Sequence, residues 1–354
     1  MSAVVAFDGI CFGDGPITGV GRSFATALAA YAQTERCILL QPEGIDVPDE
    51  LADRPLLEVV AAPRGRWQRQ RRLPSLLRAL QADLLHSSVA SVPIRASCPT
   101  IATVHDLPWL HPELGETSST WRRFATARAL RSAALILAPS EQTRRDAATL
   151  LGRKAAKIVV VPHATPQPAE PTARDETRTG PLLVLGDTRS RKNREALVRS
   201  HAAARAERHS SAKAHFEMNG PEIDGLEPSF PDLQFVGPPD NYVSEAEKTE
   251  LLRTCRALVH VSKFEGFGLP VLEGLAHGAP VLCSDLPPHR DIARDAALFV
   301  APNDERALVD ALLQIHIDRS LRQTLIAAGP QRAAAFTPAA TARAWRRLHR
   351  EVLA

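Results

Sequence analysis

Two glutamates, Glu265 and Glu273, stand in a segment whose pattern is typical of a buried strand, a glycine-containing loop and then a helix. Pro270 fits the first turn of that helix, and Gly278 fits its C-terminal end. Backbone N–H groups at the helix start, together with the helix dipole, favour an anion such as a diphosphate. A carboxylate within an apolar helix also needs a polar partner. The spacing therefore predicts a site for one extended anionic ligand, although a buried strand-to-helix unit with two incidental glutamates would look the same.

A group of cations follows a second strand-type run, residues 182–185. Arg189, Arg191 and Lys192 stand there, just ahead of a helix-length stretch. A reaction that releases a diphosphate builds negative charge on its leaving group, and fixed cations with N–H donors stabilise that charge. A solvated helix start is equally rich in such residues, so the cluster by itself is compatible with a structural role. No Asp-x-Asp motif accompanies it, and we expect neither a metal ion nor a cofactor.

Further polar groups stand at a strand end and a helix start in the N-terminal half. His105 and Asp106 come directly after an apolar run, at a strand end that would face a ligand cleft. Gly19, Gly21 and Arg22 begin a helix-length stretch, where glycine backbone can approach a phosphate closely. A lone His-Asp pair after a strand is more often structural, and Asp106 would then turn the loop or orient His105.

The composition indicates an ordinary globular protein of two domains. The chain has 354 residues, of which 44% are hydrophobic and 23% are charged. Its five cysteines are widely spaced without a Cys-x-x-Cys pair, and we expect them to be reduced. No basic leader precedes an apolar run at the N-terminus, which predicts a cytoplasmic location. The net charge of +3 is small, and no nucleic-acid partner is expected.

The excess positive charge lies in the N-terminal half, in the segments 64–72 and 121–131. These segments also carry Trp67 and Trp121. Basic patches of this kind suit anionic lipid headgroups or acidic substrates. A solvated helix face is the more frequent explanation of each patch, so peripheral contact with the inner face of the membrane is one of two open readings.

Strand-type and helix-type segments alternate twice along the chain, which predicts two α/β domains with parallel sheets. We expect an N-terminal domain at 1–165, a proline-rich linker at 166–179, a second domain at 180–336 and a terminal docking helix at 337–354. The predicted strands are 4–7, 37–40, 56–61, 100–104, 135–138, 158–161, 182–185, 213–218, 233–236, 257–261, 281–283 and 297–300. The predicted helices are 20–33, 75–81, 120–132, 141–151, 194–208, 245–255, 269–277, 305–317 and 338–353.

Four segments together resemble glycosyltransferase family 4, the retaining enzymes of GT-B fold, and especially its mannosyltransferase-like branch. Residues 262–281, with the Glu-x7-Glu pair, are similar to the family's donor-site signature. Residues 185–193 resemble its Gly-Thr-Leu-Glu-Pro-Arg-Lys-Asn segment, and residues 103–113 resemble its Val-His-Asp-Leu and His-Pro-Glu. Residues 17–24 are similar to its Gly-Gly-Ile-Gly-Arg-Tyr. The resemblance follows the family order over nearly the whole chain.

The resemblance implies two Rossmann-like domains facing across a cleft, and metal-independent, retaining transfer of a hexose from a nucleotide diphosphate sugar to an acceptor hydroxyl. Mannose is the favoured sugar, and the setting is glycan or polysaccharide biosynthesis. Glu273 would bind the ribose and Glu265 the sugar hydroxyls, while His105 would support the reacting end after domain closure. The residues implied as catalytic are His105, Glu265, Lys192 and Arg191. Those implied in substrate binding are Gly19, Gly21, Arg22, Asp106, Arg189, Gly266, Phe267, Gly268, Leu269 and Glu273.

Three departures from the family pattern bear on donor choice and activity. The family often has Asn at His163, Glu at Arg189 and a Pro-Glu pair near His289 and Arg290. Compatible acceptors are a lipid-linked oligosaccharide, a polysaccharide or a small metabolite.

Several other functions stay open beside transfer. They are a catalytically inactive sugar-binding subunit of the same fold, a GT-B epimerase or phosphorylase, and a dehydrogenase. The dehydrogenase reading rests on Gly19-x-Gly21 with Glu43 downstream, but Phe24 stands where the dinucleotide fingerprint has its third glycine.

Overall fold

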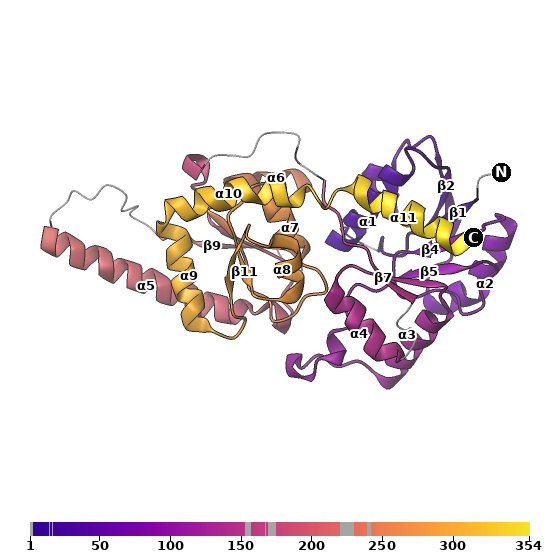
Figure 1. Ribbon diagram of the computed structural model, residues 1–354, viewed down its shortest axis with the longest axis horizontal. Helices are drawn as coiled ribbons and strands as arrows, with labels where there is room; N and C mark the ends of the chain where they lie inside the picture. Colours follow the sequence, from indigo (N-terminus) through magenta and orange to yellow (C-terminus); the bar gives the residue numbers. More distant parts are fainter. Residues whose placement is uncertain are drawn as a thin grey trace. The chain divides into compact units, whose positions relative to one another are not determined.

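The computed structural model describes residues 3–13, 15, 17–152, 157–166, 168, 175–219, 230–238 and 242–354. The chain divides into two compact units. The first unit comprises Met1–Pro166 with Phe336–Ala354, and the second comprises Gln167–Ala335. Each unit is an α/β structure built on one parallel sheet, so the predicted fold class of two Rossmann-like domains is confirmed (Figure 1).

The first unit contains a seven-stranded sheet in the order β3-β2-β1-β4-β5-β6-β7. Its paired strands all run parallel, and β1, β2 and β4 are buried along their whole length. Burial on both faces explains why most of these strands read as continuous apolar runs. The strands are β1 (Val5–Asp8), β2 (Cys37–Pro42), β3 (Leu57–Ala62), β4 (Leu84–Ser87), β5 (Thr100–Thr103), β6 (Leu135–Ala138) and β7 (Ile158–Val160).

Strand β4 was not predicted, because it has only two apolar residues before His86 and Ser87. The imidazole of His86 is fully buried, and its Nδ1 lies 2.9 Å from Nε2 of His349. A tertiary hydrogen bond thus lets a polar residue occupy the centre of the sheet, which a hydropathy pattern does not reveal.

The C-terminal helix α11 (Pro338–Leu353) packs in the first unit beside α1 (Gly19–Tyr31) (Figure 1). The predicted apolar face of α11 is buried at Ala342, Trp345 and Leu348, whereas Leu353 is exposed. Trp345 contacts the rings of Phe7 and Phe24 within the core. The other helices of this unit are α2 (Arg66–Ala79), α3 (Thr120–Ser132) and α4 (Glu141–Leu151).

The second unit contains a five-stranded parallel sheet in the order β12-β11-β10-β8-β9. Its strands are β8 (Leu182–Leu185), β9 (Leu233–Val236), β10 (Ala257–His260), β11 (Val281–Ser284) and β12 (Leu298–Val300). Its helices are α5 (Arg194–Asn219), α6 (Glu245–Thr254), α7 (Leu269–Ala276), α8 (Pro287–Ala293), α9 (Glu305–Ile317) and α10 (Arg319–Ala333).

The prediction of a strand at residues 213–218 is wrong, because helix α5 continues to Asn219. The segment Lys-Ala-His-Phe-Glu-Met contains several good helix formers, and a helix already begun at Arg194 extends through them at low cost. Figure 1 shows α5 as the longest helix of the second unit.

The end of the predicted linker is part of the second unit. Asp175 is buried and accepts hydrogen bonds from the Arg322 guanidinium at 2.7 and 3.0 Å. Arg178 is fully buried and donates to the carbonyl oxygens of Leu252 and His277 at 2.9 and 2.8 Å. Buried charges of this kind fix the backbone, so residues 175–179 do not behave as a free connection.

Candidate functional site

Glu265 lies at the centre of a buried polar cluster in the second unit. It follows β10 in the loop ahead of α7, and its residue is only 7% exposed. Three donors converge on its Oε1 atom: Lys192 Nζ at 2.6 Å, Ser262 Oγ at 2.6 Å and His260 Nε2 at 3.0 Å. Within the described part of the chain, all the hydrogen bonds that Glu265 accepts end on that one oxygen.

The cluster holds Glu265 as a carboxylate. Burial by itself opposes ionisation, but the Lys192 ammonium and the His260 hydrogen bond outweigh it and lower the pKa of Glu265 well below its usual range. The side chains of Lys192 and Glu265 are 12% and 9% exposed, so water screens their attraction little. An ammonium has three N–H donors, and one of them meets Glu265 here.

Three members of this cluster were not among the predicted site residues: Ser262, His260 and His289. His260 ends an apolar strand run and reads as part of the core, and Ser262 is a small loop residue. His289, on α8, is fully buried and donates from Nδ1 to the Ser284 carbonyl oxygen at 2.8 Å. Burial lowers the pKa of His289 to about 4, so its ring is neutral near pH 7. A signal existed in the sequence only for His289, which departs from the family pattern.

Gly268 is glycine for two separate reasons. Its φ of +112° lies in the region that side chains disfavour. A Cβ atom placed on it would also lie 2.7 Å from Cδ2 of His289. The backbone therefore passes directly over the His289 ring as it enters α7 at Leu269, whose first N–H groups have no acceptor within the helix.

Arg191 and Lys192 lie in a short 3-10 turn after β8. Arg191 is 3% exposed and donates to the Phe264 carbonyl oxygen at 3.4 Å, while its own carbonyl oxygen accepts from Lys263 N at 2.7 Å. These bonds tie the turn to the loop that carries Glu265. The structure therefore brings both predicted cations into the same buried region as Glu265 and the start of α7.

Arg189 does not join this cluster. Its side chain is 54% exposed and forms hydrogen bonds to the Asp187 carboxylate, one of them from Nε to Oδ2 at 2.9 Å. Partial burial opposes ionisation of Asp187, but the bonds from Arg189 are stronger and lower the pKa of Asp187 to about 2. Arg189 is thus already engaged by a neighbour two residues away.

Glu273, one turn inside α7, meets a cation that was not predicted. Lys248 Nζ, on α6, lies 2.8 Å from Glu273 Oε1 and 2.9 Å from Glu245 Oε2. Burial disfavours the charge of Lys248, but the two carboxylates raise the pKa of Lys248 above its usual value. The expectation that a carboxylate in an apolar helix needs a partner is met, because Lys248 supplies one.

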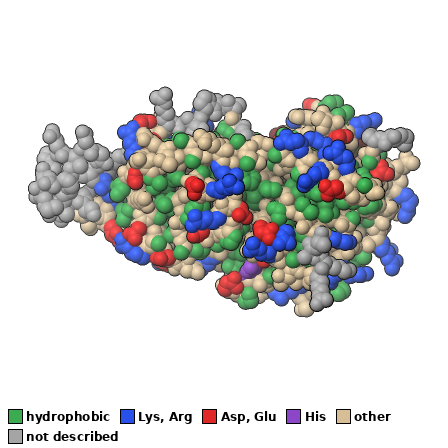
Figure 2. Space-filling model, viewed as in Figure 1, with side chains coloured by type: hydrophobic (Ala, Val, Ile, Leu, Met, Phe, Trp, Pro, Cys, Tyr) green, Lys and Arg blue, Asp and Glu red, His purple; other side chains and the backbone are tan. Residues whose placement is uncertain are grey.

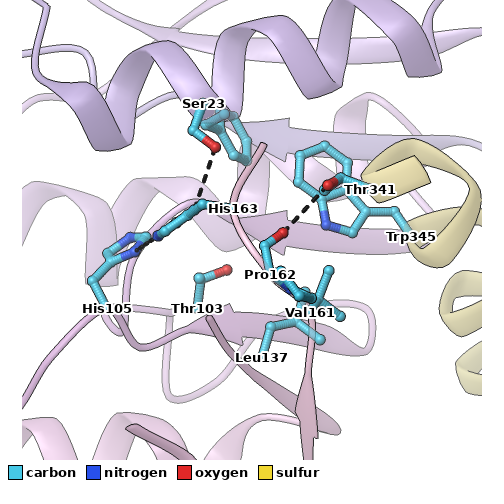
Figure 3. A pocket seen from close by; sticks show the side chains of 10 residues that line it. Ser23, Thr103, His105, Leu137, Val161, Pro162, His163, Thr341 and Trp345 are labelled. Atoms are coloured by element: carbon cyan, nitrogen blue, oxygen red, sulfur yellow. Dashed lines mark hydrogen bonds between the residues drawn. The ribbon is translucent and has the colours of Figure 1, made fainter. Parts of the chain in front are cut away.

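His105 forms part of a different cluster, in the first unit (Figure 3). The planes of the His105 and His163 rings are nearly parallel, with centroids 5.2 Å apart and an interplanar angle of 19°. His105 Nδ1 lies 3.2 Å from His163 Nε2, and His105 Nε2 donates to the Ser88 carbonyl oxygen at 2.7 Å. Burial lowers the pKa of His105, so the ring is neutral near pH 7. Both ring nitrogens therefore bond to groups other than the carboxylate of Asp106.

Gly19, Gly21 and Arg22 open helix α1 as expected. Thr18 caps the helix, because its hydroxyl accepts from Gly21 N at 3.2 Å. A Cβ atom on Gly21 would lie 2.9 Å from the Ile17 side chain, so a close approach within the turn requires this glycine. Arg22 NH1 donates to Glu50 Oε1 at 3.1 Å, so this side chain has a partner in its own unit.

The two basic segments of the first unit differ in how much charge and apolar surface they expose. Arg69, in the segment 64–72, is buried and paired with Asp8, so it contributes no surface charge. In helix α3, Trp121 and Phe124 are 60% and 56% exposed, with rings 6.0 Å apart, beside exposed arginines. By contrast, exposed pairs such as Arg306 with Glu207 mix both signs of charge on the second unit. Figure 2 shows Lys or Arg side chains close to Asp or Glu over much of the face drawn.

Two further observations concern metals and membranes. Among the described residues, no group of three or more His, Cys, Asp or Glu side chains is arranged to hold a metal ion. No helix in the described ranges combines the length and the apolar character needed to cross a bilayer.

Family models match most of the chain in overlapping parts. The model described as Glycosyltransferase Family 4 matches residues 19–166, and Glycosyl transferases group 1 matches residues 241–332. The model described as Family 4 Glycosyltransferase in conflict systems matches residues 103–286, which is more than half of the chain. These matches leave the dehydrogenase alternative without support, and buried Phe24 packs against Phe7 and Trp345 where that fingerprint needs a glycine.

Among characterised proteins, the chain is 36% identical over 96 residues to O-antigen chain mannosyltransferase B of Escherichia coli. This match covers 27% of the chain and 25% of that protein. The chain is also 38% identical over 73 residues to the O-antigen chain mannosyltransferase RfbU of Salmonella typhimurium. This second match covers 21% of each of the two chains. The chain thus spans about a quarter or less of the length of these relatives.

Solved structures resemble the chain over nearly all its length. Sucrose-phosphate synthase from Thermosynechococcus elongatus has a TM-score of 0.69 at 18% identity, covering 99% of both chains. HepE from Anabaena, in complex with UDP-glucose, has a TM-score of 0.68 at 13% identity and covers 99% of this chain and 100% of that one. WaaG, a glycosyltransferase of lipopolysaccharide biosynthesis, has a TM-score of 0.65 at 15% identity, covering 97% and 99%. At these identities the likeness concerns the fold, which is that of GT-B proteins.

Proposed function

Since the chain belongs to glycosyltransferase family 4, we propose that it transfers a hexose from a nucleotide diphosphate sugar to an acceptor hydroxyl. The observation that carries this proposal is the buried Lys192–Glu265 pair, which stands just ahead of the start of α7. A cation, a carboxylate and the N–H groups of a helix start, which have no acceptor within the helix, suit a diphosphate joined to a polyhydroxylated sugar. The cluster is formed within the second unit alone.

We assign roles to the side chains of this cluster as follows. Lys192, Arg191 and the N–H groups at the start of α7 neutralise the diphosphate, whose charge grows as the bond to the sugar breaks. Glu265 accepts hydrogen bonds from sugar hydroxyls, and the three donors on its Oε1 leave that role to Oε2. Glu273, held by Lys248, accepts from the ribose. In the first unit, His105 acts at the reacting end of the transferred sugar.

We further propose that the sugar is mannose, that its anomeric configuration is retained, and that the product is a glycan or polysaccharide. The mannosyltransferases of O-antigen synthesis to which the chain is similar support the choice of sugar. Retention would follow from a front-face displacement, in which the leaving phosphate assists the acceptor hydroxyl. The one-bond C1–H1 coupling in the NMR spectrum of the product tests this point, because the H1–H2 coupling of a mannoside is small in both anomers; an inverted product would contradict retention.

GDP-mannose is expected to raise the unfolding temperature and to support turnover in the presence of EDTA. A ligand at about 100 times its Kd stabilises the folded state by about 2.7 kcal/mol, which a thermal shift of several degrees reports. UDP-, ADP- and TDP-sugars serve as controls. Binding without turnover would favour the inactive sugar-binding subunit instead. A sugar product other than a glycoside would favour an epimerase or phosphorylase. Activity that is restored only by Mg²⁺ would contradict metal independence.

We also propose that helix α3 makes peripheral contact with anionic membrane lipids, which suits a lipid-linked acceptor. Replacing Trp121 and Phe124 with serine is expected to lower co-sedimentation with phosphatidylglycerol vesicles at least fivefold. The reason is that exposed aromatic rings insert at such surfaces and act together with the arginines, each of which contributes roughly 1 kcal/mol. The matched control is Val198→Ser, an exposed apolar residue of the second unit. Unchanged vesicle binding in the α3 variant would contradict the proposal.

A further inference from the structure

His163 stands beside His105 in a small cavity of the first unit. The cavity has a volume of about 30 Å³, room for no more than a few water molecules. Figure 3 shows the two imidazoles edge to edge, with a nitrogen of each ring pointing at the other and with Ser23 of α1 pointing at His163. Thr341 and Trp345 of α11 also line the cavity.

The hydrogen bonds of this cavity determine where each proton lies. The Ser88 carbonyl oxygen can only accept, so His105 carries its proton on Nε2. Because burial keeps His105 neutral, its Nδ1 bears a lone pair and accepts the bond from His163 Nε2–H. Burial keeps His163 neutral as well, and its pKa lies well below the usual value. Its Nδ1 therefore accepts from the Ser23 hydroxyl, at 3.4 Å.

The chain of donors continues from the backbone into the ring of His105. Ala164 N donates to Ser23 Oγ at 2.9 Å, which directs the hydroxyl proton of Ser23 toward His163. The order is thus Ala164 N–H, Ser23, His163, His105 and the Ser88 carbonyl. Each of the three side chains between the two backbone groups receives one bond and donates one, so reversing either imidazole would place two donors or two lone pairs against each other.

Hydrogen bonds to residues near the start of the C-terminal helix hold the backbone around His163. The Thr341 hydroxyl of α11 donates to the carbonyl oxygen of Pro162, the residue before His163, at 3.3 Å. Thr165 N, two residues after it, donates to the Phe336 carbonyl oxygen at 3.1 Å. The backbone on both sides of His163 is therefore held by residues 336–341, far away in the sequence.

We propose that His163 is a positioning residue: the Ser88 carbonyl holds the proton of His105 on Nε2, and His163 holds the orientation of the ring through its Nδ1. This inference rests on the proposed function, in which His105 acts at the transferred sugar. Both ring nitrogens of His105 bond within the unit, so the bonds to Ser88 and His163 fix the plane in which the ring meets the transferred sugar. Asparagine, which the family often has at this position, could also donate from its amide to His105 Nδ1.

The test begins with the imidazole protons themselves. In protein labelled with ¹⁵N-histidine, long-range ¹H–¹⁵N spectra distinguish protonated from bare ring nitrogens. We expect His105 and His163 both as the Nε2–H form in the wild type. The Ser88 carbonyl is expected to keep the proton on Nε2 of His105 in each variant. His163→Leu removes the donor to Nδ1 and is expected to shift the Nδ1 resonance of His105, whereas His163→Asn keeps a donor there and the wild-type resonance. A wild-type His163 protonated on Nδ1, or an unchanged His105 spectrum in His163→Leu, would overturn the proposal.

Kinetics with the donor identified above complete the test. His163→Leu is expected to lower kcat about 10- to 100-fold with little change in the KM for the donor, as for other groups that orient a functional imidazole. His163→Asn is expected to regain most of kcat, and His209→Leu, at an exposed histidine of α5, to leave it unchanged. Because the spectra need no substrate, a protein with the expected tautomers but no transferase activity would contradict the proposed function and leave the hydrogen-bond order intact.

Discussion

Replacing Lys192 with methionine is expected to lower kcat by about 100- to 1,000-fold while changing the KM for the donor only a few fold. The ammonium is mostly buried, and at such a position a fixed charge acts on the diphosphate with little screening. Its effect is largest when the bond to the sugar is breaking, because the diphosphate then gains charge. Steady-state kinetics over a range of donor concentrations separate the two constants.

The control for this prediction is Lys263→Met. Lys263 is exposed and stands two residues before Glu265, so its removal changes the net charge by the same amount without touching the cluster. We expect its kcat to stay within about threefold of the wild type, as for surface substitutions. An equal loss in both variants would indicate a general effect of charge and contradict the role of Lys192.

Lys192→Met should also destabilise the second unit, since it leaves the Glu265 carboxylate buried without its cation. Breaking a buried ion pair from one side costs about 3–5 kcal/mol. The double variant Lys192→Met with Glu265→Gln removes both charges and is expected to regain much of this stability but none of the turnover. Recovery of turnover in the double variant would show that Lys192 acts only through folding.

Lowering the pH from 6.5 to 5 is expected to destabilise the first unit by about 3 kcal/mol. His86 and His349 are buried beside Phe7 and Trp345, and Tyr31 Oη lies 3.2 Å from His349 Nδ1. Burial lowers the pKa of His349 to about 3 and that of His86 well below its usual value. The unfolded chain takes up protons below about pH 6.5 while the folded unit does not, so stability falls as the pH falls toward the folded pKa values.

All four tryptophans belong to the first unit, so their fluorescence reports its unfolding separately from that of the second. Denaturant titrations at several pH values would measure the free energy of unfolding. His349→Phe is expected to reduce the slope by about 1.4 kcal/mol per pH unit, because one titrating group is lost. His209→Gln, on an exposed residue, should leave the slope unchanged. An unaltered slope in His349→Phe would contradict the assignment to this pair.

The unpredicted features have physical causes in common. Strand β4 depends on the neighbours that bury it, not on local hydropathy. The helix over residues 213–218 depends on propagation of a helix that has already begun. His260 and Lys248 look like a core residue and a surface lysine in the sequence. Each becomes part of the candidate site through the fold: the loop after β10 turns Glu265 back to within 3.0 Å of His260, and α6 brings Lys248 within 2.8 Å of Glu273 on α7.

The sequence by itself determined the α/β class, the alternation of strands and helices and the start of α7, and it predicted Lys192, Glu265 and Glu273 as site residues. Those features are encoded locally, in apolar periodicity and in the residues that begin and end a helix. Only the tertiary structure decided the partners of these residues. Lys192 meets Glu265, Glu273 meets Lys248 and His105 meets His163, because each pair lies on different segments of one folded unit. A buried charge or imidazole takes its properties from such neighbours, and no local pattern specifies them.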